Sequence, residues 1–252
     1  MTNTPTRIRV EAASHTLTGP YREHNEDNFY CNCGEGIFVV ADGMGGQQAG
    51  EQASRMVVEM LPSMLTSVRE AAESFPPEER IGAAIFEVNQ SIHEYGKSHP
   101  ECHQMGTTVV AVLVIDDVLY VTGVGDSRVY HFRDNKVQQI TTDHTVTEAL
   151  LKRGLITEDQ AKVHKYRHVL WRYLGSANMS EPPEVHRIEL MPGDRFLLAS
   201  DGLTGVIEDE ELSRIVHEAG SVDEAVAQLA KRSQELDSHD NVTCIVLRVE
   251  EA

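Results

Sequence analysis

The stretch TVVAVLVIDDVLYVTGV, residues 108–124, contains two strongly apolar runs separated by a pair of acidic residues. The runs Thr108–Ile115 and Val118–Val124 are rich in β-branched residues, which favour strands. Only Asp116 and Asp117 lie between them, and so short a connection can join only antiparallel neighbours. The stretch therefore predicts a β-hairpin in an antiparallel sheet.

Similar patterns elsewhere predict the remaining elements of the fold. Further strands are expected at Asn28–Tyr30, Gly36–Ala41, Arg128–Phe132, Arg195–Ala199 and Val242–Val249. Helices are expected at Gly50–Arg69, with a kink or break at Pro62, and at Glu78–His93, Glu208–Glu218 and Val222–Glu235. Strand meanders separated by helix pairs predict an α+β fold: a four-layer sandwich of two antiparallel β-sheets flanked by helix pairs.

The segment 142–184 differs from the rest of the chain. It is richer in His, Arg and Lys, carries two short helical patterns and interrupts the series of strands. We expect a surface insertion, a flap subdomain at 142–184 within a single domain that spans residues 1–252. Its basic patch is expected to meet acidic or phosphorylated protein segments, and consists of Lys162, Lys165, Arg167 and Arg172.

The overall charge limits the partners. The net charge is −18, so nucleic acid and anionic membrane surfaces would be repelled. Met1–His15 shows no signal-peptide pattern, and the longest apolar run, Val109–Ile115, is too short to span a bilayer. Four cysteines are too few for a disulfide framework, and the pair Cys31 and Cys33 is expected to consist of ordinary strand residues. We expect a cytoplasmic monomer that binds neither nucleic acid nor membrane.

Acidic residues stand where the predicted strands begin or end. They are Glu26, Asp27, Asp42, Asp126, Asp201 and Asp240. A single Asp-Gly pair is more often an ordinary turn, but strand ends that point the same way can gather several carboxylates. Gathered carboxylates stay ionised only when cations join them, and all-oxygen ligand sets select Mg²⁺ or Mn²⁺. The combination predicts a divalent-cation site, which would also allow so acidic a protein to bind an anion such as phosphate.

Six short motifs occur in a fixed order along the chain. They are Arg22-Glu23-His24-Asn25-Glu26-Asp27, VADGMGG at 40–46, Gly106-Thr107-Thr108, Gly125-Asp126-Ser127-Arg128, Ser200-Asp201-Gly202 and Asp240-Asn241-Val242-Thr243. The ordered set resembles the metal-dependent protein phosphatases, the type 2C serine/threonine phosphatases, and in particular their compact bacterial members. The resemblance covers nearly the whole chain, and Asp143-His144 with Arg167–Leu170 resembles the flap of that family.

The resemblance implies an activity and a set of roles. The activity is hydrolysis of phosphoserine and phosphothreonine, in proteins phosphorylated by a Ser/Thr kinase, by a water or hydroxide that bridges two Mg²⁺ or Mn²⁺ ions. A third ion would bind more weakly. In the implied roles, Asp42 bridges the two ions, and the Gly43 carbonyl completes one of the two sites. Asp201 and Asp240 hold the first ion, Glu26 binds the second, and Asp126 with Asp201 binds the third. Asp27 acts through bound water, and Arg22 binds the substrate phosphate.

One position departs from the wider family. Relatives outside the bacterial subgroup carry a His directly after the Asp-Gly pair, where this chain has Met44. A thioether has no proton to donate, so the leaving alkoxide must be protonated by a metal-bound water, by solvent or by another side chain. The candidates by sequence position are His24, His144, His168 and His239. Two alternatives to a protein phosphatase remain: a small-molecule phosphatase with the same fold, and a non-catalytic binding scaffold.

Overall fold

The computed structural model describes residues 8–45, 48–134 and 136–252. The first sheet contains β1 (Ile8–Leu17), β7 (Arg128–Arg133), β8 (Lys136–Gln139), β10 (Arg195–Ala199) and β11 (Val242–Glu251). The second contains β2 (Asp27–Asn32), β3 (Ile37–Met44), β4 (Gly106–Thr107), β5 (Val109–Ile115), β6 (Val118–Val124) and β9 (Val185–Glu189). The helices are α1 (Gln48–Glu70), α2 (Pro77–Ser98), η1 (Pro100–Cys102), α3 (Val146–Lys152), α4 (Glu158–Lys162), α5 (Asp201–Thr204), α6 (Asp209–Glu218) and α7 (Val222–Glu235). Gly46 of the VADGMGG motif, and Met1–Arg7 of the segment considered for a signal peptide, lie outside the described residues.

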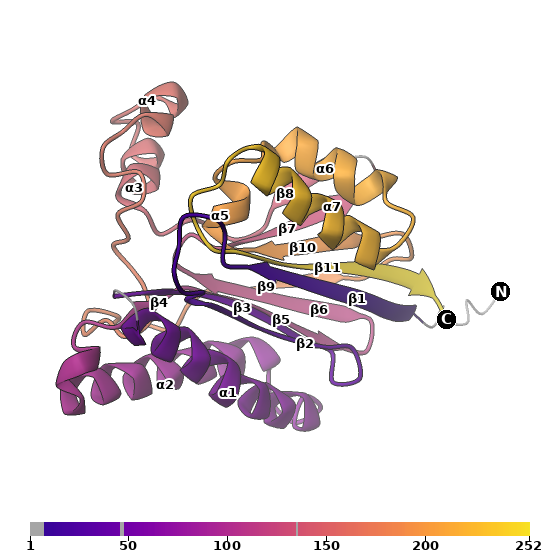
Figure 1. Cartoon of the computed structure of the whole chain (residues 1–252). Helices are drawn as coiled ribbons and strands as arrows, with labels where there is room; N and C mark the ends of the chain where they lie inside the picture. Colours follow the sequence, from indigo (N-terminus) through magenta and orange to yellow (C-terminus); the bar gives the residue numbers. More distant parts are fainter. Residues whose placement is uncertain (1–7, 46–47, 135) are drawn as a thin grey trace.

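The two sheets lie face to face between two layers of helices (Figure 1). The strand order is β1-β11-β10-β7-β8 in the first sheet and β2-β3-β5-β6-β9 in the second, where β4 also pairs with β3. Every strand pairing in both sheets is antiparallel within the described residues. The predicted four-layer α+β sandwich of antiparallel sheets is therefore confirmed.

The hairpin predicted at residues 108–124 joins β5 to β6. Ile115 pairs with Val118, so Asp116 and Asp117 alone make the turn. Asp116 has a φ of 51°, in the left-handed region that tight hairpins require and that Asp tolerates.

The central strands are apolar without a break because both of their faces are buried. On β3, Phe38 and Val40 face the other sheet, whereas Ile37, Val39 and Ala41 face the helices. Strand β11 alternates in the same way: its odd-numbered residues 245, 247 and 249 belong to the apolar layer between the sheets, and its even-numbered residues 242, 244 and 246 pack toward α6 and α7. Three apolar layers thus hold four layers of secondary structure together.

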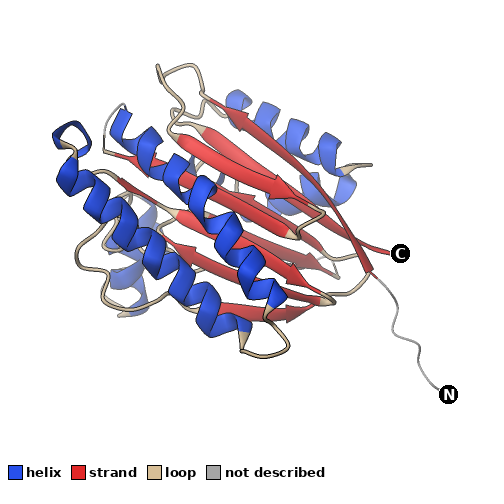
Figure 2. Ribbon diagram, turned by 90° about the horizontal axis from the view of Figure 1, so that it is seen from below, coloured by secondary structure: helices blue, strands red, loops and turns tan. Residues whose placement is uncertain are grey.

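Helices α1 and α2 run side by side over the second sheet (Figure 2). Their apolar faces, which include Leu61, Leu65, Ile85 and Ile92, are completely buried against that sheet. The predicted break at Pro62 is absent, because α1 continues to Glu70. Burial of the apolar face offsets the loss of the one backbone hydrogen bond that a proline inside a helix cannot make. No helix in the described part of the chain is long and apolar enough to cross a membrane.

A buried ion-pair network ties β7 to the turn before β10. Asp194, which is only 1% exposed, accepts hydrogen bonds from Arg133 Nε and Nη2 at 2.5 Å each, and from the backbone N–H of Met191 at 2.8 Å. His131 Nε2 lies 3.1 Å from Asp194 Oδ1. Burial by itself raises the pKa of Asp194, but the hydrogen bonds from Arg133 and His131 outweigh it and lower that pKa to about 2. The carboxylate therefore stays ionised inside the protein.

The segment 142–184 carries α3 and α4 away from the sandwich (Figure 1). Its first residues are bound to the β6–β7 connection. Arg128 donates Nε and Nη2 to the carboxylate of Asp143 at 2.8–3.1 Å. His144 and Gly125 exchange two hydrogen bonds, from the His144 N–H to the Gly125 oxygen and from the Gly125 N–H to His144 Nδ1. Burial lowers the pKa of His144 to about 4, which keeps Nδ1 free to accept at neutral pH.

Candidate metal centre

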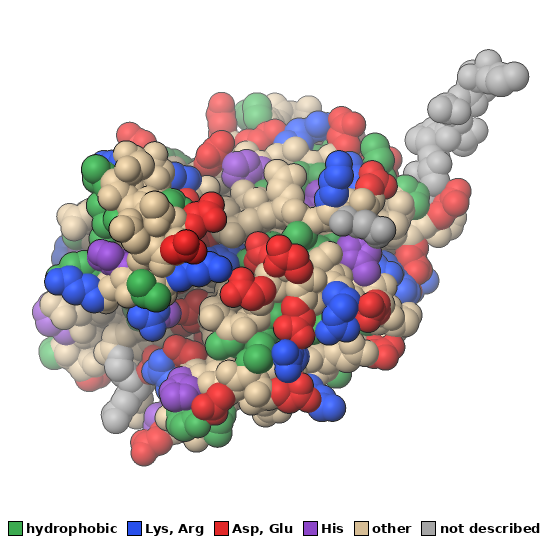
Figure 3. All heavy atoms as spheres, turned by 90° about the horizontal axis from the view of Figure 1, so that it is seen from above, with side chains coloured by type: hydrophobic (Ala, Val, Ile, Leu, Met, Phe, Trp, Pro, Cys, Tyr) green, Lys and Arg blue, Asp and Glu red, His purple; other side chains and the backbone are tan. Residues whose placement is uncertain are grey.

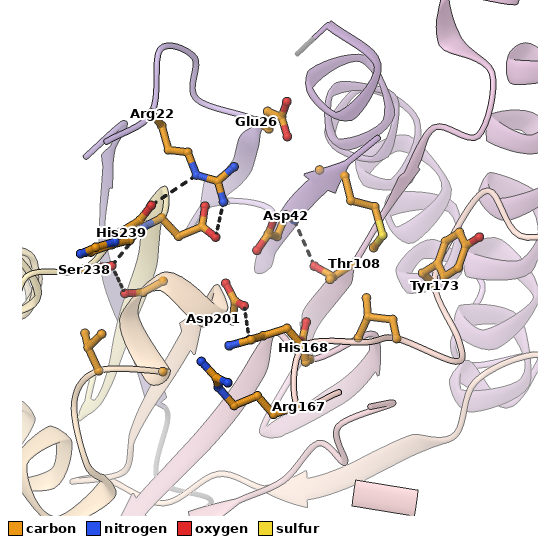
Figure 4. Close-up of a pocket in the computed structure, with 18 of the residues that line it drawn as sticks. Arg22, Glu26, Asp42, Thr108, Arg167, His168, Tyr173, Asp201, Ser238 and His239 are labelled. Atoms are coloured by element: carbon orange, nitrogen blue, oxygen red, sulfur yellow. Dashed lines mark hydrogen bonds and ion pairs between the residues drawn. The ribbon is translucent and has the colours of Figure 1, made fainter. Parts of the chain in front are cut away.

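The predicted site residues converge on one cavity of about 980 Å³ between the ends of the two sheets (Figure 4). Those that line it are Arg22, Glu26, Asp42, Gly43, Asp126, Asp201 and Asp240. Asp27 is outside the set that lines the cavity; it is 5% exposed and pairs with Asp42 across β2 and β3. Residues far apart in sequence, and from both sheets, therefore share one site.

Asp42 is fixed by its backbone. Its N–H donates to Thr108 Oγ1 at 3.0 Å, and its carbonyl accepts from the Thr108 N–H at 2.8 Å and from Thr107 Oγ1 at 2.9 Å. The sequence placed Asp42 and Gly43 after the strand, which was wrong, because β3 continues to Met44 and pairs with β4 there. The added pairing holds the carboxylate in a defined position.

Glycines allow α1 to approach β3 beside Glu26. The Gly43 N–H donates to the Glu26 carbonyl at 3.1 Å. A Cβ at Gly43 would lie 2.6 Å from that carbonyl oxygen and closer still to Gly50, and a Cβ at Gly50 would lie 2.8 Å from Glu26 Oε2. Any larger residue at either position would displace Glu26 from the cavity wall.

Asp201 and Asp240 come from the first sheet. Asp201 is the first residue of α5 and follows Ser200 at the N-cap, so its Asp-Gly pair begins a short helix and is not an ordinary turn. The Ser200 hydroxyl donates to Asp27 Oδ2 at 2.8 Å and accepts from the Thr243 N–H at 3.0 Å. Asp240, immediately before β11, accepts at Oδ2 from Arg22 Nη2 at 2.7 Å. Ser200 thus connects the acids of the two sheets.

Asp126 reaches the cavity through a turn that only glycine can make. The preceding Gly125 has a φ of 105°, and a Cβ there would lie 2.6 Å from Thr108 Cγ2. The backbone of Gly125 is also the part of the chain bound by His144, at the start of segment 142–184.

The raised pKa values of the acidic side chains indicate that cations bind at this site. Burial, together with repulsion from Asp201 and other neighbouring carboxylates, raises the pKa of Asp27 to about 7, that of Asp126 to about 8 and that of Asp42 well above its usual range. Burial also raises the pKa of Glu26 and that of Asp201, the latter with repulsion from Asp240 as the next cause. One buried oxygen of Asp27 and one of Asp201 have no hydrogen-bond partner within the described residues.

Such unpaired oxygens fit a bound ion, and the donor set, carboxylates with one backbone carbonyl, is the kind that Mg²⁺ and Mn²⁺ prefer. In the described part of the chain, no three His, Cys, Asp or Glu side chains are arranged so that they could together hold a metal ion. The signs of a metal are therefore the unpaired oxygens and the raised pKa values.

Other side chains around the cavity answer questions that the sequence left open. Met44 lines it, as do two of the four histidine candidates, His168 and His239, whereas His24 and His144 are not among the described lining residues. His168 Nδ1 lies 3.8 Å from Asp201 Oδ2. Of the basic residues predicted to meet a substrate, Arg167 lines the cavity and points into it (Figure 4).

Several supporting residues were not predicted as part of the site. Asn241 accepts from the Glu26 N–H at 2.8 Å and donates to the carbonyls of Thr18 and His24, so it joins the two loops that carry Glu26 and Asp240. Asn241 and Ser200 each stand next to a predicted acid in a motif quoted above, and Thr108 stands in another of those motifs. That adjacency was the available signal, because a side chain that holds a ligand must lie near it in space.

Comparisons with known proteins place this chain in the class of protein serine/threonine phosphatases. The family model "Protein phosphatase 2C" matches residues 21–241. The chain is 32% identical over 241 residues to serine/threonine phosphatase stp of Listeria welshimeri, which covers 94% of this chain and 95% of that protein. The chain therefore belongs to the protein phosphatase 2C family.

Solved structures agree with this assignment. The Mycobacterium tuberculosis serine/threonine phosphatase PstP/Ppp matches with a TM-score of 0.85 and 31% identity over 96% of this chain and 99% of that one. The catalytic domain of serine threonine protein phosphatase PstP in complex with two manganese ions matches with a TM-score of 0.83 and 30% identity, over 96% of this chain and 99% of that one.

Proposed function

We propose that the chain is a Mg²⁺- or Mn²⁺-dependent phosphoprotein phosphatase that hydrolyses phosphoserine and phosphothreonine through a water that bridges two ions. The observation that carries the proposal is the convergence of five of the predicted carboxylates and Arg22 on one cavity. Buried carboxylate oxygens without partners and strongly raised pKa values support the binding of cations there. The manganese complex of the structurally similar PstP catalytic domain supports the same view.

The proposed roles follow the positions of the side chains. Asp42 lies between the acids of the two sheets and would bridge two ions, with the Gly43 carbonyl as a further ligand. Asp201 and Asp240 would hold the first ion, Glu26 would hold the second, and Asp126 with Asp201 would hold a third. Asp27, which does not line the cavity, would act through water. Bound divalent cations would supply Lewis acidity, which activates water near neutral pH.

Arg22 would bind the phosphate group. Two of its three guanidinium nitrogens donate to described residues, Nε to the His239 carbonyl at 3.3 Å and Nη2 to Asp240 at 2.7 Å (Figure 4). The same two contacts fix the plane of the guanidinium at the cavity wall. Nη1 is then available to a phosphate oxygen, and the charge of the guanidinium balances that of the anion. Met44 has no proton for the leaving group, so solvent or a histidine at the wall would supply it.

We propose further that 142–184 is a flap subdomain within one catalytic domain of residues 1–252. Arg167, His168, Leu170 and Tyr173 of this segment line the cavity, which supports contact with the phosphoprotein substrate. Acidic and basic side chains are interspersed over the face drawn in Figure 3, so that face offers no single-sign surface for nucleic acid. All four cysteines are free thiols, which supports a cytoplasmic location. The expected substrates are products of a Ser/Thr kinase, and the expected state is a monomer.

An assay of metal-stripped protein tests the proposal. Phosphate release from a phosphothreonine peptide is expected with added Mn²⁺ or Mg²⁺ and is expected to be lost in excess EDTA, because the acids alone cannot activate water. Hydrolysis of p-nitrophenyl phosphate, assayed in parallel, distinguishes an inert scaffold from an enzyme. Undiminished turnover in EDTA would exclude the metal mechanism. Turnover of the aryl phosphate without any of the phosphopeptide would favour a small-molecule phosphatase.

Metal binding is expected to release protons near neutral pH. Asp27, with a pKa of about 7, and Asp126, with a pKa of about 8, are partly protonated at pH 7 without ions, and so is Asp42, whose pKa is raised well above its usual range. Bound cations would favour the ionised forms of all three. Calorimetric titration of Mn²⁺ at pH 7, in buffers of different ionisation enthalpy, should show release of at least about one proton per chain.

The release should be smaller at pH 9, where Asp27 and Asp126 are already ionised. Asp126→Asn should release fewer protons at pH 7 than the wild type. Mn²⁺ binding at pH 7 without any proton release would contradict the raised pKa values.

A further inference from the structure

Three exposed side chains at the mouth of the cavity hold one another in place: Tyr21, Asp237 and His239, here called the Tyr21 cluster. The Tyr21 hydroxyl donates to Asp237 Oδ1 at 2.8 Å. The ring of Tyr21 stacks on that of His239, with centroids 4.0 Å apart and 26° between the planes. His239 Nε2 lies 3.3 Å from the other carboxylate oxygen of Asp237. Tyr21 is 55% exposed, so these contacts, and not burial, order the cluster.

The cluster fixes an unusual turn between α7 and β11. Asp237 has a φ of 59°, in the left-handed region that few residues other than Gly, Asn and Asp adopt. The next residue, Ser238, is buried and donates its hydroxyl to the Gly202 carbonyl at 2.8 Å. The turn is thus held from the solvent side by Tyr21 and from the inside by Ser238. The position of the His239 carbonyl is thereby defined.

That carbonyl accepts the hydrogen bond from Arg22 Nε, at 3.3 Å (Figure 4). Arg22 follows Tyr21 directly in the chain, and its side chain is 45% exposed. An exposed arginine has many rotamers, and ordering it on substrate binding costs binding free energy. A fixed hydrogen-bond acceptor for Nε orders the guanidinium before the substrate binds and keeps it directed toward the cavity.

We propose that Tyr21, Asp237 and His239 are positioning residues for Arg22, which they orient toward the phosphate group of the substrate. The inference rests on the proposed phosphatase function. Asp237 and His239 line the cavity, but Tyr21 is not among the described lining residues, so Tyr21 is expected to act through the His239 carbonyl and Arg22 and not on the substrate. The affected quantity is therefore affinity for the phosphate group, which every substrate shares.

The test compares Tyr21→Ala, which removes both the hydroxyl and the stacked ring, with Tyr21→Phe, which removes the hydroxyl alone. For Tyr21→Ala, KM should rise about three- to tenfold for both p-nitrophenyl phosphate and a phosphothreonine peptide, while kcat changes less than about twofold. The inhibition constant of inorganic phosphate should rise by the same factor. Tyr21→Phe should lie between wild type and Tyr21→Ala.

A double variant identifies Arg22 as the residue through which the cluster acts. In an Arg22→Ala background, Tyr21→Ala should change KM by less than about 1.5-fold, because the group that it positions is absent. Phe75→Ala removes another exposed aromatic ring, away from the cavity, and should leave KM unchanged. The Mn²⁺ concentration for half-maximal activity should be unchanged in Tyr21→Ala, which excludes an effect through Asp240.

Three results would overturn the inference while the enzyme remains active. The first is an unchanged KM in Tyr21→Ala. The second is a KM in the double variant that rises by the product of the increases seen in Tyr21→Ala and Arg22→Ala. The third is a raised Mn²⁺ requirement of Tyr21→Ala in place of a raised KM. A wild-type protein that hydrolyses neither substrate with Mn²⁺ would overturn the proposed function, and this inference with it.

Discussion

Replacement of Asp42 by Asn is expected to lower kcat/KM for phosphopeptides by about 10³-fold or more. Asn keeps the shape of the side chain and the backbone bonds to Thr107 and Thr108, but it removes the negative charge on which the proposed bridging of two ions depends. The fold should not suffer. The pKa of Asp42 is raised well above its usual range, so its ionised form opposes folding of the metal-free protein as the pH rises above the unfolded value.

The matched control is Asp117→Asn in the β5–β6 turn, an exposed residue away from the cavity, which should keep wild-type kcat/KM. Thermal unfolding in EDTA at pH 8 should show Asp42→Asn at least as stable as the wild type. Retention of more than about a tenth of wild-type activity in Asp42→Asn would refute the central role of this carboxylate.

Replacement of Asp194 by Ala should destabilise the protein by about 2–3 kcal/mol, because it removes a buried carboxylate that accepts charge-assisted hydrogen bonds, while the remaining Arg133 side chain is 30% exposed and can be rehydrated. For a domain of this size, the melting temperature should fall by roughly 4–12 °C. The charge contribution has a defined pH window. The folded pKa of about 2 lies below the ordinary value, so the stabilisation is complete above about pH 4 and is lost as the pH falls through 2.

Glu189→Ala provides the comparison. Glu189 pairs with Arg187 at 3.2 Å, but the two side chains are 71% and 47% exposed, so its loss should cost less than about 1 kcal/mol. Urea unfolding of both variants in EDTA measures the difference. If Asp194→Ala does not fold, Asp194→Asn retains the shape without the charge and should still lose more stability than Glu189→Ala. Equal losses in the two positions would show that burial does not strengthen the Asp194 network.

The strands that could be predicted from the sequence are those buried on both faces. Strands β3 and β11 appear as unbroken apolar runs because successive side chains enter two different apolar layers. Strand β1 was not predicted, although it pairs with β11 along its whole length. It lies at the edge of its sheet, and Ala13 is its only fully buried residue in the described structure, so its apolar pattern is weak. Strand β9, another edge strand, was missed for the same reason.

Only those side chains of the candidate site that are themselves charged could be predicted from the sequence. The acids could be recognised because their charge beside apolar strands needs an explanation. Their supports could not be recognised, since Ser200 meets Asp27 across 173 residues and Tyr21 meets Asp237 across 216. Such contacts depend on how the two sheets are placed against each other. That placement results from the packing of the whole apolar layer between them, and no local pattern encodes it.

The long pairing of β1 with β11 makes the molecule easy to tether. Leu17 pairs with Val242 beside the cavity, whereas Ile8 pairs with Glu251 at the opposite end of the same two strands, roughly 30 Å away (Figure 1). A tag, a linker or a second folded unit attached near Ile8 or Glu251 would project from the sandwich on the side remote from the cavity. Immobilisation through this end should therefore leave the mouth of the cavity free to receive large phosphorylated proteins.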